Sequence, residues 1–563
     1  MTVDAVLLLP LAVLWPLLLA GLSLVPGWGP RMLSALPLGP LPALAAAVTA
    51  PRDLPVALPG VLLDGGLELT GTGALFLGGA AVLWFCAGVY AARYMHGDRN
   101  PVVFTLFWNL VLAGNLGVFI AADIVSFYVS FALVSLMAYP LVIHDRRPAS
   151  LRAGTVYIAL AVVGEATILV GFMLASHGAG GAIGIAEVRE ALAASTAHPA
   201  ALSLLIVGFG IKAGLMPLHV WLPVAHPAAP TPASAVLSGA IVKAGIFGLV
   251  AFLPLGSPAT VTGMGLALMG FAGLFAAALL GMAQSNAKSV LAYSTVSQMG
   301  LVMGVLGVAL ADGVPAAAVL PAVALFALHH GLAKGALFLG AGLASDCGGA
   351  WRWGLLAVLA ALALSFAGLP LTAGALVKSA IKEPAGALGA MLIGLSSLTS
   401  GLILTRFIFV LPDCEHGSRP ALLMVLPVLA LAGAALWLPW VLYTGIVATA
   451  PLAVEDALSL IGSAWPLGLA LLLSVVAFGV GLQPPPIPEG DLLGPVLRMA
   501  MAGRAAFRAG VAAGSRVLSE AARPQRNVWG EDFERLERII MDRAVTAIFL
   551  LVICGAIIVA FLA

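Results

Sequence analysis

Apolar runs of about twenty residues recur along almost the whole chain, separated by short loops that carry most of its charge. A run of this length is enough to cross the hydrocarbon core of a bilayer as one helix. Of the 563 residues, 61% are hydrophobic and only 9% are charged, which is typical of helices that face lipid and one another. The sequence therefore predicts an all-α polytopic membrane protein.

We expect about sixteen transmembrane helices from the apolar runs and the turn signals between them. The first is expected to be a retained anchor, because Asp4 replaces a basic leader. On the polar loop at 175–199, the segment AEVREALAAS is predicted to form a short surface helix. The predicted spans are 5–24, 31–50, 72–92, 102–122, 123–143, 152–174, 200–222, 233–254, 259–281, 288–308, 315–343, 353–381, 387–411, 420–444, 464–483 and 543–563.

Basic residues in the short loops fall mainly on one side of this arrangement. Cytoplasmic loops carry an excess of lysine and arginine, so we expect that side to face the cytoplasm of a bacterial or archaeal cell, in the inner (plasma) membrane, with the N-terminus outside. The residues on that side are Arg93, Arg99, Arg146, Arg147, Arg152, Lys288, Arg352, Arg406 and Arg419, whereas Arg52, Arg189 and Lys382 lie on the other.

Two neighbouring spans within 202–252 each place one lysine near mid-bilayer, at Lys212 and Lys243. A charge at that depth costs at least about 2.5 kcal/mol on insertion scales, so both lysines are candidate functional residues that could share one aqueous pocket. Pro217 follows Lys212 by five residues, and a proline removes a backbone hydrogen bond and clashes with the preceding turn. We expect this helix to break inside the membrane. The backbone polar groups freed at such a break are tolerated only where protein or a water-filled cavity satisfies them.

A second span shows the same elements in mirrored order. In SFAGLPLTAGALVKSAIK the lysine, Lys378, follows Pro370, whereas Lys212 precedes its proline. Mirrored order fits two repeats of opposite topology, an arrangement that places sites in discontinuous helices near the midplane. We therefore expect breaks in the seventh and twelfth spans.

Further titratable residues lie inside predicted spans. In LFALHHGLAKGALFLGAG, His330 and Lys334 are four residues apart on one helical face, a spacing suited to a proton relay. His219 lies seven residues past Lys212 and is expected near the same face, as a weaker candidate. Glu165 is the only carboxylate in the middle of a span. A buried carboxylate must pair with a cation or stay protonated.

The blocks IKAGLMPLHVWLPVAHPAAPTPASAVLSGAIVKAGIFGL, AKSVLAYSTVSQMG, HHGLAKGALFLGAG and AGLPLTAGALVKSAIK occur in this order. From about Tyr90 to Arg406 the chain resembles the antiporter-like membrane subunits of respiratory complex I, Mrp-type sodium/proton antiporters and formate-hydrogenlyase-type membrane hydrogenases. The resemblance implies a core of two inverted five-helix repeats. It also implies relay roles for Lys212 and Lys243 in helices seven and eight, for His330 and Lys334 in helix eleven, and for Lys378 in helix twelve.

One position departs from the family pattern. The resemblance implies a fifth-helix glutamate paired with the seventh-helix lysine, but Ala132 stands at the matching position. We hypothesise that Glu165, one helix later, supplies the carboxylate from an adjacent helix.

These observations predict six segments. They are N-terminal transmembrane helices at 1–92, a first antiporter repeat at 93–254, a second at 255–411, C-terminal core helices at 412–483, a cytoplasmic linker with an amphipathic interfacial helix at 484–542, and a final transmembrane anchor at 543–563.

The expected function is proton translocation, with sodium as an alternative ion, as one subunit of a membrane complex with other membrane subunits in the lipid bilayer. A free-standing solute transporter and a non-conducting scaffold for a redox or carbon-uptake partner remain alternatives. The four cysteines form no CxxC pair, so we expect no cofactor, metal or redox centre in this chain. The formal charge of +1 favours no nucleic-acid partner. Whether the parent complex is an enzyme stays open.

Overall fold

The protein is described from a computed structural model. The structure describes residues 7–60, 62, 64–194, 199–413, 419–447, 461, 464–481 and 487. All helices below belong to one compact unit, Met1–Glu489. The predicted linker and anchor at 484–542 and 543–563 lie outside the described residues, apart from Ile487.

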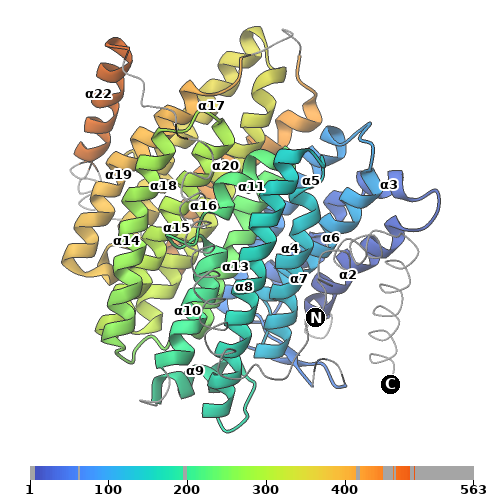
Figure 1. Cartoon of the computed structure of the whole chain (residues 1–563), viewed down its shortest axis with the longest axis vertical. Helices are drawn as coiled ribbons and strands as arrows, with labels where there is room; N and C mark the ends of the chain where they lie inside the picture. The colour runs from blue at the N-terminus through green and yellow to red at the C-terminus, as the bar shows by residue number, and fades with distance from the viewer. Residues whose placement is uncertain are drawn as a thin grey trace, which may run out of the picture. The chain divides into compact units, whose positions relative to one another are not determined.

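Eleven helices in the described part of the chain are long and apolar enough to cross a membrane, and four more apolar helices are shorter. They form a bundle of roughly aligned helices (Figure 1). The prediction of a polytopic helical membrane protein is confirmed at this level.

The N-terminal region differs from the prediction. α2 (Leu8–Ser23) matches the first predicted span, but the second, 31–50, is divided into α3 (Gly29–Ser34), the 3-10 helix η1 (Leu36–Leu38) and α4 (Leu41–Thr49). Prolines at 37, 40 and 42 explain the division, because proline lacks the N–H that a continuing helix needs. The expectation of one continuous span there was wrong.

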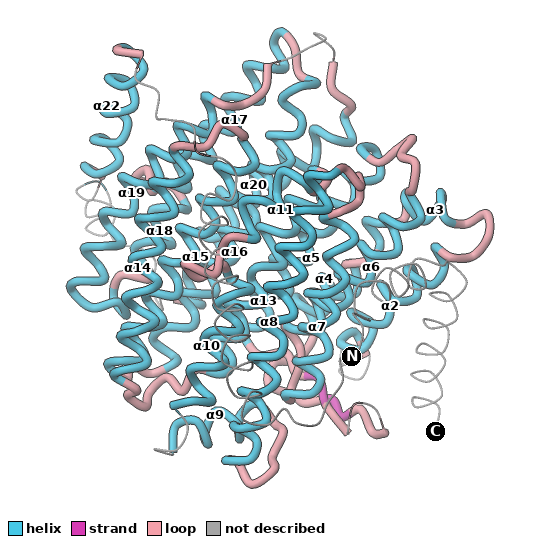
Figure 2. The backbone as a smooth tube through the Cα atoms, in the orientation of Figure 1, coloured by secondary structure: helices cyan, strands magenta, loops and turns pink. Residues whose placement is uncertain are grey.

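A small two-stranded cap lies at one end of the bundle. Strands β1 (Val56–Ala57) and β2 (Gly66–Leu67) pair antiparallel, and isolated bridges join Leu67 to Ala121 and Asp123 to Gly184. The predicted surface helix is present as α9 (Ile185–Ala194), at the same end of the bundle as the strands (Figure 2).

Four long helices follow the cap in the chain. They are α5 (Gly71–Tyr94), α6 (Pro101–Val118), α7 (Ile124–Val142) and α8 (Pro148–Gly178). The carboxylate of Asp123 fixes the start of α7, since Oδ1 accepts hydrogen bonds from the backbone N–H groups of Val125 and Ser126.

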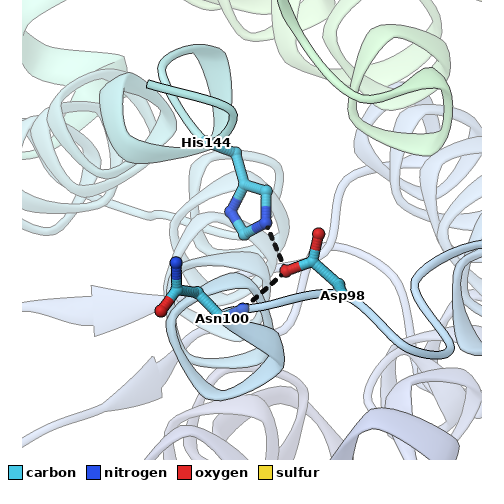
Figure 3. Close-up of polar contacts among 3 residues, drawn as sticks. All are labelled: Asp98, Asn100 and His144. Carbon is cyan, nitrogen blue, oxygen red and sulfur yellow. Dashed lines mark hydrogen bonds and ion pairs between the residues drawn. The ribbon is translucent and has the colours of Figure 1, made fainter. Parts of the chain in front are cut away.

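At the other end of these helices, one polar contact joins the loop after α7 to the loop between α5 and α6. His144, just past α7, places Nε2 at 3.0 Å from Asp98 Oδ1 in the loop between α5 and α6. The same oxygen accepts from the backbone N–H of Asn100 at 2.7 Å (Figure 3). This contact fixes two of the loops that carry the predicted cytoplasmic arginines.

The seventh predicted span is broken, as expected. α10 (Pro199–Ala213) stops four residues before Pro217, and α11 (Trp221–Ala228) resumes after a turn in which Gly214 has φ +87°. The eighth span is α12 (Thr231–Val236), the π-helix η2 (Leu237–Ile241) and α13 (Val242–Phe252), which run as one continuous 22-residue helix.

The next three helices pack closely. They are α14 (Thr260–Met282), α15 (Ala287–Asp312) and α16 (Ala316–Leu343). Glycines on α14 and α15 let their backbones touch: a Cβ added at Gly270 would lie 2.7 Å from the carbonyl oxygen of Gly300. Small residues at the interface are the usual way for membrane helices to approach closely.

The twelfth predicted span is broken as well. α17 (Gly349–Ala367) ends at Gly368, which has φ +97°, and α18 (Ala373–Ala380) carries Lys378 after the break. The remaining elements are the 3-10 helices η3 (Ala344–Asp346) and η4 (Glu383–Ala385), then α19 (Gly386–Phe409), α20 (Leu422–Ile446) and α22 (Trp465–Gly479).

Candidate functional site

The seven residues singled out from the sequence are all buried. The most exposed of them, Glu165, has 6% of its surface accessible, and the set comprises Glu165, Lys212, His219, Lys243, His330, Lys334 and Lys378. Burying a charged side chain without compensation costs several kcal/mol. The contacts of each side chain therefore indicate what the site can do.

The first cluster surrounds Lys212 at the end of α10. Lys212 Nζ donates a hydrogen bond to the hydroxyl oxygen of Tyr157 at 3.2 Å, and that hydroxyl donates to the carbonyl oxygen of Ser135 at 2.7 Å. Two side chains, from α8 and α10, and a backbone carbonyl of α7 therefore form one short hydrogen-bonded chain.

Glu165 lines the same cavity as Lys212. Tyr157, Ser135 and Trp221 also contribute to its wall, and the space left for the centre of a water molecule is about 10 Å³. That is close to the minimum that holds one water molecule. The structure thus brings Glu165 and Lys212 to one cavity, as the hypothesis about the replaced carboxylate requires. Ala132 lies one turn before Ser135 on α7.

Lys212 and Lys243 line two different cavities in the described part of the chain. Lys243 lines a different small cavity, with Phe76, Phe119 and Gly239 among its walls. The two helices nevertheless touch at Gly245, where an added Cβ would lie 3.1 Å from Lys212 Cβ. The structure therefore gives each lysine its own cavity, in place of the single aqueous pocket expected from the sequence.

The second cluster centres on Lys243. Its Nζ donates to the carbonyl oxygen of Ser238 at 2.7 Å and lies 2.6 Å from His330 Nδ1. Ser238 belongs to the π-helix η2. A π-turn inside a helix shifts the backbone hydrogen bonds by one residue and is frequent at functional sites. Here the carbonyl in the π-turn is an acceptor for the buried amine.

Lys334 joins the same network from the other side. Its Nζ donates to the carbonyl oxygen of Leu291 at 3.0 Å, and the same oxygen accepts from Thr295 Oγ1. Thr295 Oγ1 in turn lies 2.7 Å from Ser238 Oγ. Hydroxyl groups thus connect the surroundings of Lys243 and Lys334.

The aromatic ring of Phe366 lies between the second cluster and the third. Lys334 Nζ lies 4.9 Å from its centroid, and the ring of His330 lies at 5.3 Å. The ring of His329 also lies near this ring, at 6.1 Å.

The third cluster surrounds Lys378 at the break between α17 and α18. Lys378 Nζ donates to the carbonyl oxygen of Ala367 at 3.1 Å, next to Phe366, and to the hydroxyls of Ser397 and Ser400. Gln298 Nε2 donates to Ser400 Oγ at 3.0 Å. The end of the broken helix supplies a free carbonyl to the lysine, just as the π-turn does for Lys243.

The prediction for His219 was wrong in one respect. His219 lies in the turn between α10 and α11, so helical periodicity does not carry it from Lys212 to the same helix face. Its ring instead faces Tyr293 on α15, with the centroids 5.9 Å apart.

Several polar residues of these clusters were not predicted. Tyr157, Ser238, Gln298 and Ser400 carry hydroxyl or amide groups that sequence reasoning does not separate from ordinary buried polar residues. His226 was missed because it lies in a proline-rich segment interpreted as a break. Its position seven residues after His219 was the only available signal.

Chemically, the site offers amines, imidazoles and one carboxylate, groups that can exchange protons, and each amine is bonded to a hydroxyl, a carbonyl or an imidazole. In order through the bundle the groups are Glu165 with Lys212, then Lys243 with His330, then Lys334, then Lys378. Buried titratable groups inside a membrane protein commonly mark a substrate or ion pathway, proton relays among them.

Comparison with known proteins gives concordant matches. Residues 121–405, just over half of the 563-residue chain, match the family described as "NADH:quinone oxidoreductase/Mrp antiporter, TM". Hydrogenase-4 component B of Escherichia coli is 32% identical over 277 residues, covering 46% of this chain and 40% of that protein. NADH-quinone oxidoreductase subunit N of Desulforudis audaxviator is 30% identical over 309 residues, covering 54% and 59%. The chain spans about half the length of the curated relatives it matches.

A solved structure shares the fold. A chain of the Mrp complex from a Dietzia species superimposes with a TM-score of 0.72 at 23% identity, over 94% of this chain and 62% of that chain.

Proposed function

The chain belongs to the NADH:quinone oxidoreductase/Mrp antiporter membrane family, and from this premise we propose that it is a proton-translocating subunit of a multi-subunit membrane complex. Relatives are named as subunits or components of a hydrogenase and of a quinone oxidoreductase. The observation that carries the proposal is the line of buried lysines, each held by a neighbouring hydroxyl, carbonyl or imidazole.

In this proposal protons move by successive exchange between neighbouring groups. A lysine that gives up its proton leaves a neutral amine, and this changes the electrostatic field at the next group in the line. Glu165 supplies the negative charge for Lys212 in the place of the carboxylate missing at Ala132. The cavity that both residues line supports this pairing.

The finer topology is part of the proposal. We infer about sixteen spans, with two inverted five-helix repeats at 93–254 and 255–411 as the core. The mirrored position of Lys212 before one break and Lys378 after the other supports the inversion. The arginine-rich loops face the cytoplasm of a bacterial or archaeal plasma membrane, and the N-terminus faces outside.

The experiment is proton uptake by vesicles containing the assembled complex. Lys212→Ala and Lys378→Ala should each abolish uptake, while the variant subunits still co-purify with the complex in normal amounts. Replacing sodium with choline in the buffer tests the alternative ion, and unchanged proton uptake supports protons alone. Wild-type uptake in both lysine variants would overturn the proposal and favour a non-conducting scaffold.

A further inference from the structure

His226 on α11 is a fully buried histidine outside the line described above. Its exposure is 0%, and neither ring nitrogen has a hydrogen-bond partner among the residues that the structure describes. Burying an unsatisfied polar group costs about 1–3 kcal/mol. A native protein keeps such a group for a reason, commonly an ordered water molecule or a role in chemistry.

The ring of His226 is held in a fixed place. It stacks on Phe338 of α16 with the centroids 4.6 Å apart and the planes at 23°. Its backbone carbonyl accepts from Ser234 Oγ at 2.8 Å. Phe338 is one helical turn from Lys334, on the same face of α16. Stacking therefore holds the imidazole next to the turn of α16 that carries a buried relay lysine.

Lys288, at the start of α15, approaches the same segment from the surface side. It is partly exposed, and its Nζ donates to the carbonyl oxygen of Ala229 at 2.9 Å, three residues past His226. Leu291, which accepts the hydrogen bond of Lys334, follows Lys288 by three residues on α15. His226 thus stacks on the helix that carries Lys334, and the segment that follows it is bonded to the partly exposed Lys288 of α15.

We propose that His226 is a relay residue that carries protons between the surface at Lys288 and the buried amine of Lys334. This inference rests on the proposed function. Lys288 lies on the side of the arginine-rich loops, so the route would connect the line of buried lysines to the cytoplasm. His226 is suited to this task because, within the described part of the chain, no group bonds to either ring nitrogen.

The transfer balances at the ring. Neutral His226 accepts a proton on one ring nitrogen, through water, from the ammonium group of Lys288, and the resulting neutral amine of Lys288 takes a proton from a hydronium ion at the surface, which becomes water. The imidazolium then releases the proton of its other nitrogen, through water, to the neutral amine of Lys334, which becomes ammonium. The ring is left neutral as the other tautomer and returns to its first form before the next transfer.

The test compares proton uptake by vesicles containing the assembled complex with wild-type chain, His226→Gln, His177→Gln and Lys212→Ala. Glutamine keeps a polar side chain of similar length but cannot carry the proton, so uptake should fall about tenfold or more in His226→Gln. His177 is exposed at the end of α8, and the same substitution there should leave uptake unchanged.

Lys288→Arg provides a second variant that does not depend on the folding of His226→Gln. Arginine keeps the charge and can keep the donor to Ala229, but it does not lose its proton. A relay role predicts slower uptake, whereas a purely structural role predicts the wild-type rate. Wild-type uptake in His226→Gln or in Lys288→Arg, with Lys212→Ala inactive, would overturn this inference and leave the proposed function intact. An inactive wild-type complex would overturn both.

Discussion

Lys243 Nζ on α13 lies 2.6 Å from His330 Nδ1 on α16. The amine donates when Nδ1 carries no proton, and a neutral amine can accept when Nδ1 carries one, so the two groups are placed to exchange a proton. The two residues are 87 positions apart in the chain, and both are at most 3% exposed. The pair is the point where the two halves of the proposed path meet.

Removal of either partner should therefore stop the same step. Lys243→Met and His330→Gln should each slow proton uptake by about tenfold or more. Residues that act as a unit are not additive, so the double variant should be no slower than the slower single variant. Vesicle uptake rates of the three variants give this comparison directly. Multiplicative losses would show that the two residues act in separate steps.

The hypothesis that Glu165 supplies the carboxylate missing at position 132 can be tested by moving a glutamate from 165 to 132. Glu165→Gln should abolish or strongly slow uptake, because Lys212 loses the negative charge in its cavity. Ala132 is one turn from Ser135, which lines that cavity. Adding Ala132→Glu to the Glu165→Gln chain should restore part of the uptake. If Glu165→Gln alone transports at the wild-type rate, the hypothesis that Glu165 takes the missing role is wrong.

Tyr157 joins Lys212 to α7, so its hydroxyl should matter for both stability and transport. Tyr157→Phe leaves the carbonyl of Ser135 without this donor and Lys212 without this acceptor, which should cost about 1–3 kcal/mol of unfolding free energy. Thermal unfolding of the purified subunit and vesicle uptake measure the two effects. Tyr94→Phe, at a tyrosine that is 40% exposed, is the matched control and should change neither quantity.

The two-stranded cap should respond to pH through Glu68. Partial burial, with repulsion from Asp53, raises the pKa of the Glu68 carboxyl above its ordinary value. The folded state therefore binds this proton more tightly than the unfolded chain, and the associated stability is lost as the pH rises through the folded pKa. Glu68→Gln should raise the melting temperature slightly at pH 7 and leave it unchanged at about pH 4. If the melting temperatures of Glu68→Gln and wild type differ by the same amount at pH 7 and at about pH 4, this prediction is wrong.

Much of the fold follows from the sequence because the membrane imposes simple rules. Runs of apolar residues fix where helices such as α5, α14 and α16 lie, and Pro217 correctly predicted a break near Lys212. The division of 31–50 was missed because prolines can lie at the start of a short helix as well as interrupt a long one. A hydropathy average does not distinguish these cases.

The candidate site was predictable where a charge stands alone among apolar residues, as at Lys212, Lys334 and Glu165. Which of these side chains lie close together was not predictable. Contacts such as that between Lys243 and His330 depend on how the helices pack, and the spacing of residues in the sequence does not reveal them. Periodicity also misled at His219, since a break resets the helical phase. His226 was missed for a different reason: it lies within a proline-rich segment that was interpreted only as a break in the helix.

Two glycines let the helices that carry Lys243 and His330 approach closely. A Cβ added at Gly239 in the π-helix η2 would lie 2.7 Å from the carbonyl oxygen of Gly331 on α16, and backbone atoms at that distance must move apart. Gly239→Ala should therefore cost about 1–3 kcal/mol of unfolding free energy. Because the substitution separates the helices that carry Lys243 and His330, proton uptake should fall as well. Gly265→Ala, at a helical glycine with open space around it, should leave both unchanged. Equal stability and uptake in the two alanine variants would show that this contact does not set the geometry of the pair.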